Sequence, residues 1–304
     1  MASTLKNVAI IGASGDVGRI ILGALLDASS FNVTILSRSS SEASFPPGVT
    51  VRKTDFSSAD LQTALKGQDA LISAVGATAF GEQKKFIDAA IQAGVPRFIP
   101  SEFSADTLND EVLALLPLFR QKKDVIEYLK SKESDSFTWT GVASSCLFDW
   151  GIGNGFLGYD IASRSATIWD GGDKKFTFTN QKQLQEAVVS VLRKPDATAN
   201  QYLYISSVET SQNEILSALK LVTSSEWTVT PTKTQDEVSA AIAKLGKGDF
   251  SGALTLVRAT TYADIPGMGS NYAKDRELAN GLLGLEEESV EETIKKVVDA
   301  FVSK

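Results

Sequence analysis

The sequence predicts an α/β fold, in which a doubly wound parallel sheet is followed by a smaller, mainly helical C-terminal part. Three observations predict it. A short apolar run at residues 8–11 leads through a glycine-rich turn into an apolar helix pattern. Three more strand-and-helix units follow within the first hundred residues, joined by short links, and much of the later sequence has helical periodicity. Strands that alternate with helices form a parallel sheet, and ligands of such sheets bind at the carboxyl ends of the strands.

The composition fits a globular chain with one large domain or two smaller ones, because 43% of its 304 residues are hydrophobic and 22% are charged. The single cysteine, Cys146, excludes an intramolecular disulfide and any zinc site with several cysteines. A net charge of −7 without a basic cluster argues against nucleic acid as a ligand. Residues 1–6 lack the apolar core of a signal peptide, and no run approaches a membrane span. We therefore expect a cytoplasmic protein without membrane contact.

The chain contains no histidine, which excludes several kinds of active site. Serine–histidine–acid triads, histidine metal sites and histidine as a general acid or base are all ruled out. We expect no metal site. Proton chemistry must use a lysine, a tyrosine, a carboxylate, a hydroxyl or a bound cofactor.

The turn after the first strand carries three glycines at Gly12, Gly15 and Gly18. Backbone N–H groups and the positive end of the following helix dipole meet in such a turn and form an anion site. Gly12 would allow the tight turn, Gly15 the close approach of a pyrophosphate, and Gly18 the close packing of helix on strand. The pattern predicts a Rossmann-type dinucleotide site, with contacts from Gly12, Ser14, Gly15, Asp16, Val17 and Gly18.

The second strand, at residues 32–37, is followed by Arg38 and Ser39. In this fold the residue at that place meets the adenosine ribose. An acidic residue there would favour NAD, whereas an arginine would pair with a 2′-phosphate. We therefore predict NADPH/NADP as the cofactor; the alternative is a solvated arginine in a serine-rich loop.

The next strands are expected at residues 49–52, 70–75 and 96–100, with a helix at 82–93. Asp55 would lie near the adenine ring, or else cap the helix that begins near Ser58. The end of the strand at 70–75 should pass beneath the adenosine and nicotinamide ribose, which adds Ala74, Val75 and Gly76 to the expected cofactor contacts.

Gln83 and residues 89–103 strongly resemble the NmrA-like and isoflavone reductase-like families, which are atypical short-chain dehydrogenases/reductases. The resemblance includes the glycine turn and Arg38, and it covers the first 150 residues better than the rest. Its most specific part is the Pro-Ser-Glu-Phe segment at residues 100–103. The resemblance implies an NADPH-dependent reductase of a small, apolar molecule that is aromatic or phenolic in class.

The resemblance also implies a catalytic lysine near the start of the next helix. The family places this lysine three residues after an aromatic, with apolar residues three and seven positions beyond it. Phe119, Val125 and Leu129 fit that spacing around Lys122, whereas Lys123 would place Lys130 at the last position. We expect Lys122 to contact the cofactor and to act as general acid/base. The alternative is a solvated cationic helix face.

A second candidate, the Tyr-x-x-x-Lys pair of Tyr128 and Lys132, has the spacing of typical short-chain dehydrogenases. Tyr128 comes nearly two turns after Lys122, and Lys132 lies where the helix should end. We therefore reject this pair as the catalytic one.

The strand expected at residues 137–142 would bring its end close to the nicotinamide, by family position. We expect cofactor contacts there from Ala143 and Ser145, and a further one from Phe103. The irregular, glycine-rich segment that follows would form a lid or wall over an apolar substrate. The candidate substrate contacts are Phe103, Phe148, Trp150 and Phe156, with ordinary core packing as the alternative for each.

The second half begins with a predicted β-hairpin, in which strands 166–169 and 175–178 flank a glycine turn. A helix at 181–193 and a strand at 202–205 should return to the main sheet. Three more helices are expected near 211–223, 234–245 and 289–302, the last with a capping box of Ser289 and Glu292. Residues 262–272 would form a loop that closes over the substrate or lies on the surface. The domain boundary falls near residue 150: residues 1–150, with the return of 181–206, would bind NADP, and 151–304 would bind substrate.

The leading hypothesis is an NADPH-dependent reductase of a small molecule, as a monomer or homodimer. The alternative is a non-catalytic NADP(H)-binding redox sensor of the NmrA type, which would act through a protein partner. The lysine favours the enzyme. Two departures favour the sensor: Ile126 replaces the reductases' arginine, and the loop after the second strand lacks a second basic residue.

Overall fold

The computed structural model describes residues 5–303, and the chain forms two compact units. The first unit contains Met1–Phe103, Arg120–Val142 and Leu184–Leu203. The second unit contains Ser104–Phe119, Ala143–Gln183 and Tyr204–Lys304. The division therefore does not follow a single cut near residue 150, because Ser104–Phe119 and the residues from Ala143 onward pack with the second unit.

The first unit is built on a seven-stranded sheet with the order β10-β6-β5-β4-β1-β2-β3. Neighbouring strands from β6 to β3 pair in parallel. The order reverses between β1 and β4, and a crevice opens at such a reversal in doubly wound sheets. The expected return of the later strand is confirmed, because β10 lies beside β6. The strands are β1 (Asn7–Ile11), β2 (Asn32–Arg38), β3 (Thr50–Thr54), β4 (Ala70–Ser73), β5 (Arg97–Ile99), β6 (Thr138–Ala143) and β10 (Gln201–Tyr204).

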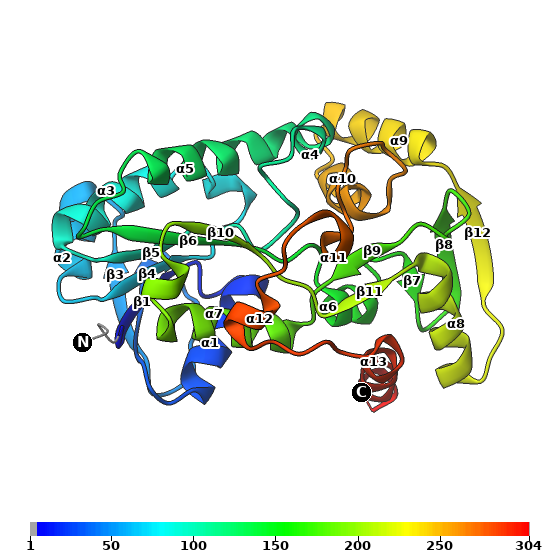
Figure 1. Cartoon of the computed structure of the whole chain (residues 1–304), viewed down its shortest axis with the longest axis horizontal. Coiled ribbons are helices and arrows are strands. Elements are labelled where there is room, and N and C mark those ends of the chain that lie inside the picture. Colours follow the sequence, from blue (N-terminus) through cyan, green and yellow to red (C-terminus); the bar gives the residue numbers. More distant parts are fainter. Residues whose placement is uncertain (1–4, 304) are drawn as a thin grey trace. The chain divides into compact units, whose positions relative to one another are not determined.

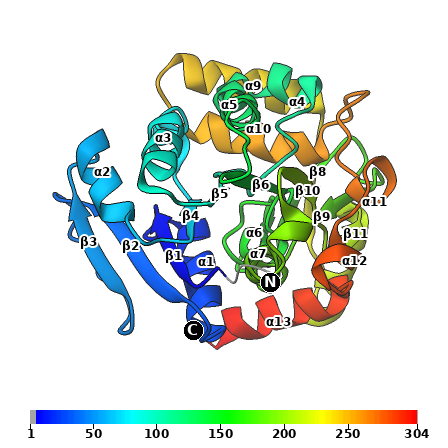
Figure 2. The same ribbon diagram turned by 60° about the vertical axis from the view of Figure 1, so that its left-hand side comes forward.

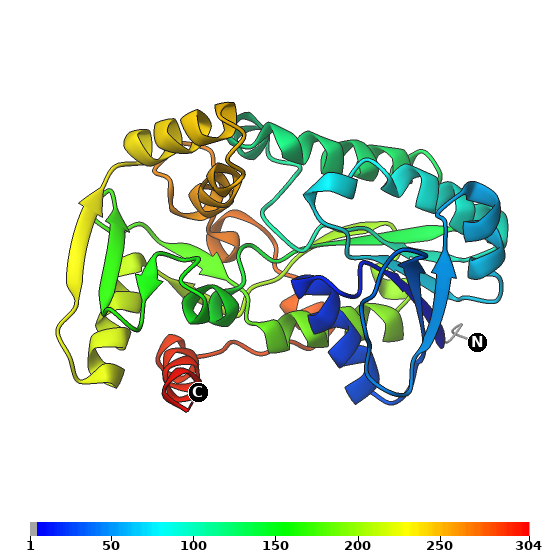
Figure 3. The same ribbon diagram turned by 180° about the vertical axis from the view of Figure 1, so that it is seen from behind.

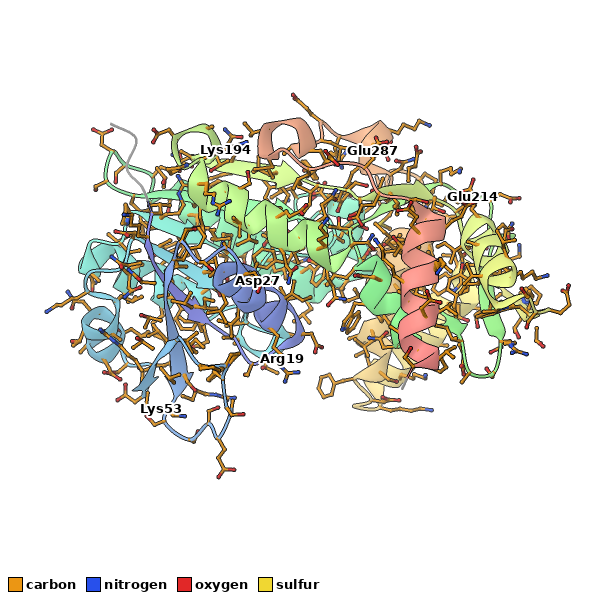
Figure 4. All side chains as sticks on the ribbon, turned by 90° about the horizontal axis from the view of Figure 1, so that it is seen from below. Arg19, Asp27, Lys53, Lys194, Glu214 and Glu287 are labelled. Atoms are coloured by element: carbon orange, nitrogen blue, oxygen red, sulfur yellow. The ribbon has the colours of Figure 1, made fainter. Side chains whose placement is uncertain are left out.

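Helices cover both faces of this sheet, as expected for a doubly wound fold (Figure 1). α1 (Asp16–Asp27) and α7 (Gln181–Arg193) lie on one face, where the Gln185 side chain donates a hydrogen bond to the Ile20 carbonyl at 3.2 Å. Figure 4 shows these two helices side by side, with Arg19 and Asp27 on α1. The helices on the other face are α2 (Ser58–Leu65), α3 (Gln83–Ala93) and α5 (Arg120–Lys130).

The core of this unit comes from the apolar runs that the sequence shows. The inner residues of β1 and β4 are completely buried, as their continuous apolar character predicts for strands covered on both faces. β3 lies at the edge beside β2 (Figure 2), and most of its side chains are exposed. Two short 3-10 turns, Ala77–Ala79 and Asp196–Thr198, connect these elements.

The second unit has two small sheets and several helices. One sheet has the order β12-β8-β7, and the other pairs β11 with β9. Figure 3 shows β12 beside β8, and α9 beside α10. The strands are β7 (Tyr159–Asp160), β8 (Ser165–Trp169), β9 (Phe176–Phe178), β11 (Val208–Thr210) and β12 (Thr228–Thr232). The helices are α4 (Asp110–Leu115), the 3-10 turn Pro117–Phe119, α6 (Phe148–Gly153), α8 (Gln212–Thr223), α9 (Thr234–Gly246), α10 (Ser251–Tyr262), α11 (Tyr272–Asp275), α12 (Asn280–Leu283) and α13 (Val290–Val302).

The predicted hairpin is wrong, because β8 and β9 belong to different sheets. Asp170, Gly171 and Gly172 have φ values of 49°, 88° and 82°, and these left-handed residues turn the chain away from β8. The Asp170 carboxylate then accepts the Thr234 N–H at the start of α9, at 3.2 Å. Asp173 in the same turn accepts a hydrogen bond from the Asn213 side chain at 2.6 Å. β8 instead pairs with β12, which lies about sixty residues later in the chain.

Two further segments differ from expectation. The aromatic segment after β6 is irregular only in part, since Phe148–Gly153 forms α6. α10 was not foreseen, and it ends at Tyr262, where the expected loop begins. The three expected helices are confirmed as α8, α9 and α13, and Ser289 caps the last by accepting the Glu292 N–H at 3.3 Å. Within residues 5–303, none of the helices combines the length and the apolar character that crossing a membrane requires.

Candidate active site

A cavity of about 470 Å³ opens in the first unit at the carboxyl ends of β1, β2 and β4. This is the edge where the reversal in strand order predicts a ligand. The cavity brings together much of the predicted nucleotide site. The expected contacts that line it are Gly12, Ser14, Gly15, Arg38, Asp55, Ala74, Val75 and Gly76. Additional lining side chains that were not foreseen include Phe45 and Phe56.

The three glycines of the turn have different surroundings: two are packed closely against backbone atoms, and one faces open space. Gly12 has φ +89°, and a Cβ on it would lie 2.4 Å from the Ala74 carbonyl oxygen. A Cβ on Gly18 would lie 2.1 Å from the Gly12 oxygen, so helix and strand pack too closely for any side chain. A Cβ on Gly15 would meet only the Gly12 oxygen, at 3.5 Å. The space over Gly15, at the first turn of α1, is therefore open to a ligand. Asp16 and Val17 begin α1 beside it.

Arg38 ends β2 at the rim of this cavity and is exposed. Within residues 5–303 its guanidinium has no hydrogen-bond partner. The Ser41 N–H donates to the Arg38 carbonyl at 2.9 Å, which folds the serine loop back over the end of the strand, and the adjacent Ser39 N–H donates to the Thr54 carbonyl at 3.0 Å. The guanidinium is thus placed to receive an anion at the rim.

Lys53 supplies a second basic group that sequence reasoning missed. It lies on β3 opposite Ser37 of β2, and its ammonium donates to the Ser41 carbonyl in the loop after Arg38. Figure 4 labels Lys53 on this edge strand. The loop after β2 contains no second basic residue, but the neighbouring strand β3 provides one. The β2–β3 register brings the two together, and this register is not visible in the sequence.

Asp55 lies in the turn between β3 and α2, where its carboxylate accepts the Ser57 N–H at 2.8 Å. Hydrogen bonds from Ser57 lower the pKa of the Asp55 carboxyl, so it is ionised at neutral pH. The N-cap of α2 is Ser57, whose side chain accepts the Asp60 N–H at 3.3 Å. Asp55 therefore shapes the turn and lines the cavity, and the capping role belongs to Ser57.

Lys122 is buried, with only 3% of its surface exposed. Its ammonium donates a hydrogen bond to the Glu102 carbonyl at 2.6 Å and lies 4.7 Å from the centre of the Phe80 ring. Burial lowers the pKa of Lys122 to about 8, although the nearby Glu102 charge opposes this effect. Val125 and Leu129 are fully buried on the same side of α5, as the spacing predicts. The solvated-face alternative is therefore wrong for Lys122.

The pair of Tyr128 and Lys132 has another role. The Tyr128 hydroxyl donates to the Asp88 carboxylate at 2.6 Å, and Lys132 forms a long ion pair with the same carboxylate at 4.0 Å. The hydrogen bond to Asp88 raises the pKa of Tyr128, which is the wrong direction for a tyrosine that must release a proton. Lys132 lies beyond the end of α5 at Lys130. The two residues join α5 to α3.

Hydrogen bonds from the Pro-Ser-Glu-Phe segment connect the carboxyl ends of β4 and β5. The Ser101 hydroxyl donates to the Val75 carbonyl at 2.8 Å, and the Ser101 N–H donates to the fully buried Gln83 side chain at 2.8 Å. These bonds join the ends of β4 and β5 to the start of α3. Phe103 follows with φ +26° and is buried.

The remaining predicted residues belong to the second unit. Ala143 ends β6, and Ser145 has φ +55° with its N–H bonded to the Ser104 carbonyl at 3.0 Å. Phe148 is 0% exposed and stacks on Phe178, with ring centroids 5.4 Å apart, so the core-packing alternative fits Phe148. Trp150 and Phe156 are half-buried and their rings are 5.5 Å apart. These two rings therefore present aromatic surface that Phe148 does not.

Comparison with known proteins gives consistent similarities. The model of the NmrA-like family matches residues 4–242. Oxidoreductase aprR of Aspergillus flavus is 38% identical over 298 residues, which cover 97% of this chain and 99% of that protein. Oxidoreductase poxI of Penicillium oxalicum is 35% identical, with coverage of 94% and 92%. Among solved structures, AtPrR2 with NADP+ and (+)pinoresinol has a TM-score of 0.79 at 19% identity and covers 98% of this chain and 100% of its own. At that identity the structural likeness is one of fold alone.

Proposed function

Because this chain belongs to the NmrA-like family, we propose that it is an NADPH-dependent reductase of a small apolar molecule, aromatic or phenolic in class. The two fungal relatives are both named oxidoreductases, and the similar solved structure contains NADP+. The observation that carries the proposal is the cavity over the glycine turn with Arg38 at its rim. A nucleotide with an extra phosphate fits this combination.

The residues of the cavity fit each part of NADP(H). The open space over Gly15 and the N–H groups at the start of α1 suit a diphosphate, which is an anion. The Arg38 guanidinium suits the 2′-phosphate, because arginine binds phosphate through two parallel hydrogen bonds. Lys53 adds positive charge beside the same loop. Asp55, the one carboxylate expected near the adenine, also lines the cavity and follows β3, which is two strands away from β1 in the sheet.

NADPH supplies a hydride when it is bound. Lys122 would supply the accompanying proton to the substrate oxygen. With a pKa of about 8, Lys122 is protonated in most molecules at neutral pH. It nevertheless gives up its proton far more readily than an ordinary lysine. Its bond to the Glu102 carbonyl fixes the position of the ammonium. Positioning and one acid/base group would then carry the catalysis.

Aromatic side chains support the proposed substrate class. Trp150 and Phe156 in the second unit are half-buried and offer flat apolar surface, against which an aromatic ring packs well. We propose these two as substrate contacts, whereas Phe103 is buried and stays only a candidate. Ala143 and Ser145 remain proposed contacts of the nicotinamide end.

The redox-sensor alternative is favoured by one observation. Ile126 replaces the arginine of the reductases and is fully buried, so that no positive charge occurs there. A sensor would bind NADP(H) and report its redox state to a protein partner without turnover.

The test is NADPH binding by calorimetry, followed by NADPH oxidation with aromatic enones, benzylic ethers and propenyl phenols. Tight binding with turnover of one class supports the reductase. Tight binding with no turnover of any class favours the sensor. No binding of NADPH contradicts both.

A further inference from the structure

We propose that Glu102 and Tyr202 are positioning residues for Lys122: Glu102 holds the ammonium through its main-chain carbonyl, and Tyr202 holds Glu102 in place. The inference deepens the proposed function, since it concerns the same lysine. All three residues lie in the first unit. The juxtaposition comes from β10, which reaches the sheet only after the chain has left it and returned.

The first step concerns the backbone at Glu102. The φ of Phe103 sets the direction of the peptide that carries the Glu102 carbonyl, and this φ is +26°. Positive φ is unfavourable for a residue with a bulky side chain and persists only where the surroundings hold it, at a cost of about 1–3 kcal/mol. The carbonyl so directed accepts the Lys122 ammonium at 2.6 Å. The unusual backbone therefore serves the lysine contact.

The second step concerns what holds this backbone. The Glu102 side chain is 1% exposed, and its carboxyl accepts a hydrogen bond from the Tyr202 hydroxyl at 2.9 Å. Tyr202 lies on β10, two strands away from β5 in the sheet. A buried carboxyl with a phenol donor is held much more firmly than an exposed one. Tyr202 thus fixes the side chain of the residue whose carbonyl binds Lys122.

The third step concerns Gly141 on the intervening strand β6. A Cβ on Gly141 would lie 2.9 Å from Cδ2 of the Tyr202 ring. The ring therefore crosses β6 where β6 has no side chain, and this crossing lets the hydroxyl reach Glu102. A glycine in a strand interior is otherwise unfavourable, so the close approach explains it.

The charged groups around Lys122 also support a positioning role for Glu102. The Lys122 ammonium faces Glu102, which follows β5, and the uncharged Phe80 ring. On the same helix, Arg120 is exposed and Lys123 is half-buried. Burial lowers the pKa of Lys122, and the Glu102 charge raises it. Glu102 therefore favours the protonated form of Lys122, the state that a proton donor needs.

The test measures the pKa of Lys122 directly, by NMR of protein labelled with ¹³C at the lysine ε-carbons, with Lys122→Met to assign the signal. Glu102→Gln keeps the main-chain carbonyl and an acceptor for Tyr202 but removes the charge. We expect the pKa of Lys122 to fall by about one pH unit or more, since a nearby opposite charge has effects of that size. An unchanged pKa would overturn the electrostatic part of the inference.

Tyr202→Phe keeps the ring but removes the hydroxyl, and it tests the positioning part even if Glu102→Gln fails to fold. We expect kcat to fall about tenfold with KM and NADPH affinity unchanged, as for a displaced proton donor. Gly141→Ala, which pushes the ring away, should have the same effect. The matched control is Tyr204→Phe on the same strand, whose hydroxyl binds Asp106 at 3.2 Å. Equal effects of Tyr202→Phe and Tyr204→Phe would overturn the positioning role.

The pKa measurement needs no substrate, so its outcome is separate from that of the proposed function. If the pKa of Lys122 responds to Glu102→Gln but Lys122→Met retains full turnover, the reductase mechanism fails and the contact between Glu102 and Lys122 stands. If turnover depends on Lys122 but the pKa of Lys122 does not change in Glu102→Gln, the reductase mechanism stands and the electrostatic role of Glu102 fails.

Discussion

Gly18 packs directly against the carbonyl of Gly12: a Cβ on Gly18 would lie 2.1 Å from the Gly12 oxygen and 2.8 Å from the Ala13 Cα. These are backbone atoms, which cannot rotate out of the way as a flexible side chain can. Gly15, three residues earlier, has no such neighbour, since its Cβ would meet only the Gly12 oxygen at 3.5 Å. Gly18 is therefore required for close packing, whereas the space over Gly15 is open for the proposed diphosphate.

Substitution of these two glycines by alanine should separate folding from binding. Gly18→Ala should lower the thermal unfolding temperature by several degrees, because α1 must move away from β1. Gly15→Ala costs the N-cap about 1 kcal/mol or less, so the fold should be retained. Its methyl group would enter the space of the diphosphate, and NADPH affinity should fall at least about tenfold. Calorimetry and thermal unfolding measure the two effects. Undiminished NADPH binding by folded Gly15→Ala would place the diphosphate elsewhere.

Arg38→Ala should weaken NADPH binding while leaving NADH binding nearly unchanged. A charged hydrogen-bonded contact contributes about 1.5–3 kcal/mol, which corresponds to about 10- to 100-fold in the NADPH dissociation constant. NADH lacks the 2′-phosphate and serves as the internal control in the same titration. Equal losses of affinity for the two nucleotides would contradict the assignment of Arg38 to the phosphate.

Lys53→Met should also weaken NADPH binding, though less than Arg38→Ala. The Lys53 ammonium is bonded to the Ser41 carbonyl and must leave it, or contribute through charge alone. We expect about a threefold to tenfold loss that shrinks as salt is added, because exposed charges are screened. Lys66→Met, which removes an exposed lysine just after α2, is the matched control. If the two variants bind NADPH equally well, Lys53 has no part in the site.

The sequence is sufficient where structure depends on neighbours along the chain. The glycine turn and the arginine after β2 follow from spacing along the chain, and the face of α5 that carries Lys122 follows from the spacing that the family resemblance implies. Partners that depend on strand register were missed. Lys53 meets the loop after Arg38 only through the β2–β3 pairing, and Tyr202 reaches Glu102 only because β10 inserts beside β6.

The predicted hairpin failed for the same physical reason. Two short strands joined by a glycine turn fit a hairpin locally, but the pairing of β8 with the distant β12 is the one that forms. The left-handed residues at Asp170, Gly171 and Gly172 fit either outcome, so the turn sequence does not distinguish them. Local turn chemistry indicates that a chain reverses, whereas long-range packing selects the strand it pairs with.

Lys122 should make the stability of the fold depend on pH. Its pKa is lowered from 10.5 to about 8 by burial, so between these values the folded chain has released a proton that the unfolded chain keeps. Stability from this group therefore rises with pH across that window. Burial raises the pKa of the Cys146 thiol to about 11, which acts in the opposite sense above pH 9.

The difference between wild type and Lys122→Met cancels the effect of Cys146, since both proteins contain it. This difference in the free energy of unfolding should shift in favour of wild type by on the order of 2 kcal/mol from about pH 8 to about pH 10. Urea unfolding at several pH values measures it. A difference that stays flat over this range would mean that the lysine has an ordinary pKa.

Lys122→Met should abolish turnover while NADPH binding remains close to that of wild type. Methionine retains much of the apolar length of the lysine beside Phe80 but has no proton to give, and general acid catalysis contributes about 10²- to 10⁴-fold in rate. Lys123→Met removes the neighbouring charge on α5 and is the control. In wild type, kcat should fall as the pH rises through about 8, because the protonated form of Lys122 is the proposed donor. Rates like those of wild type in Lys122→Met would remove this lysine from the mechanism, whatever its burial and its contact with Glu102.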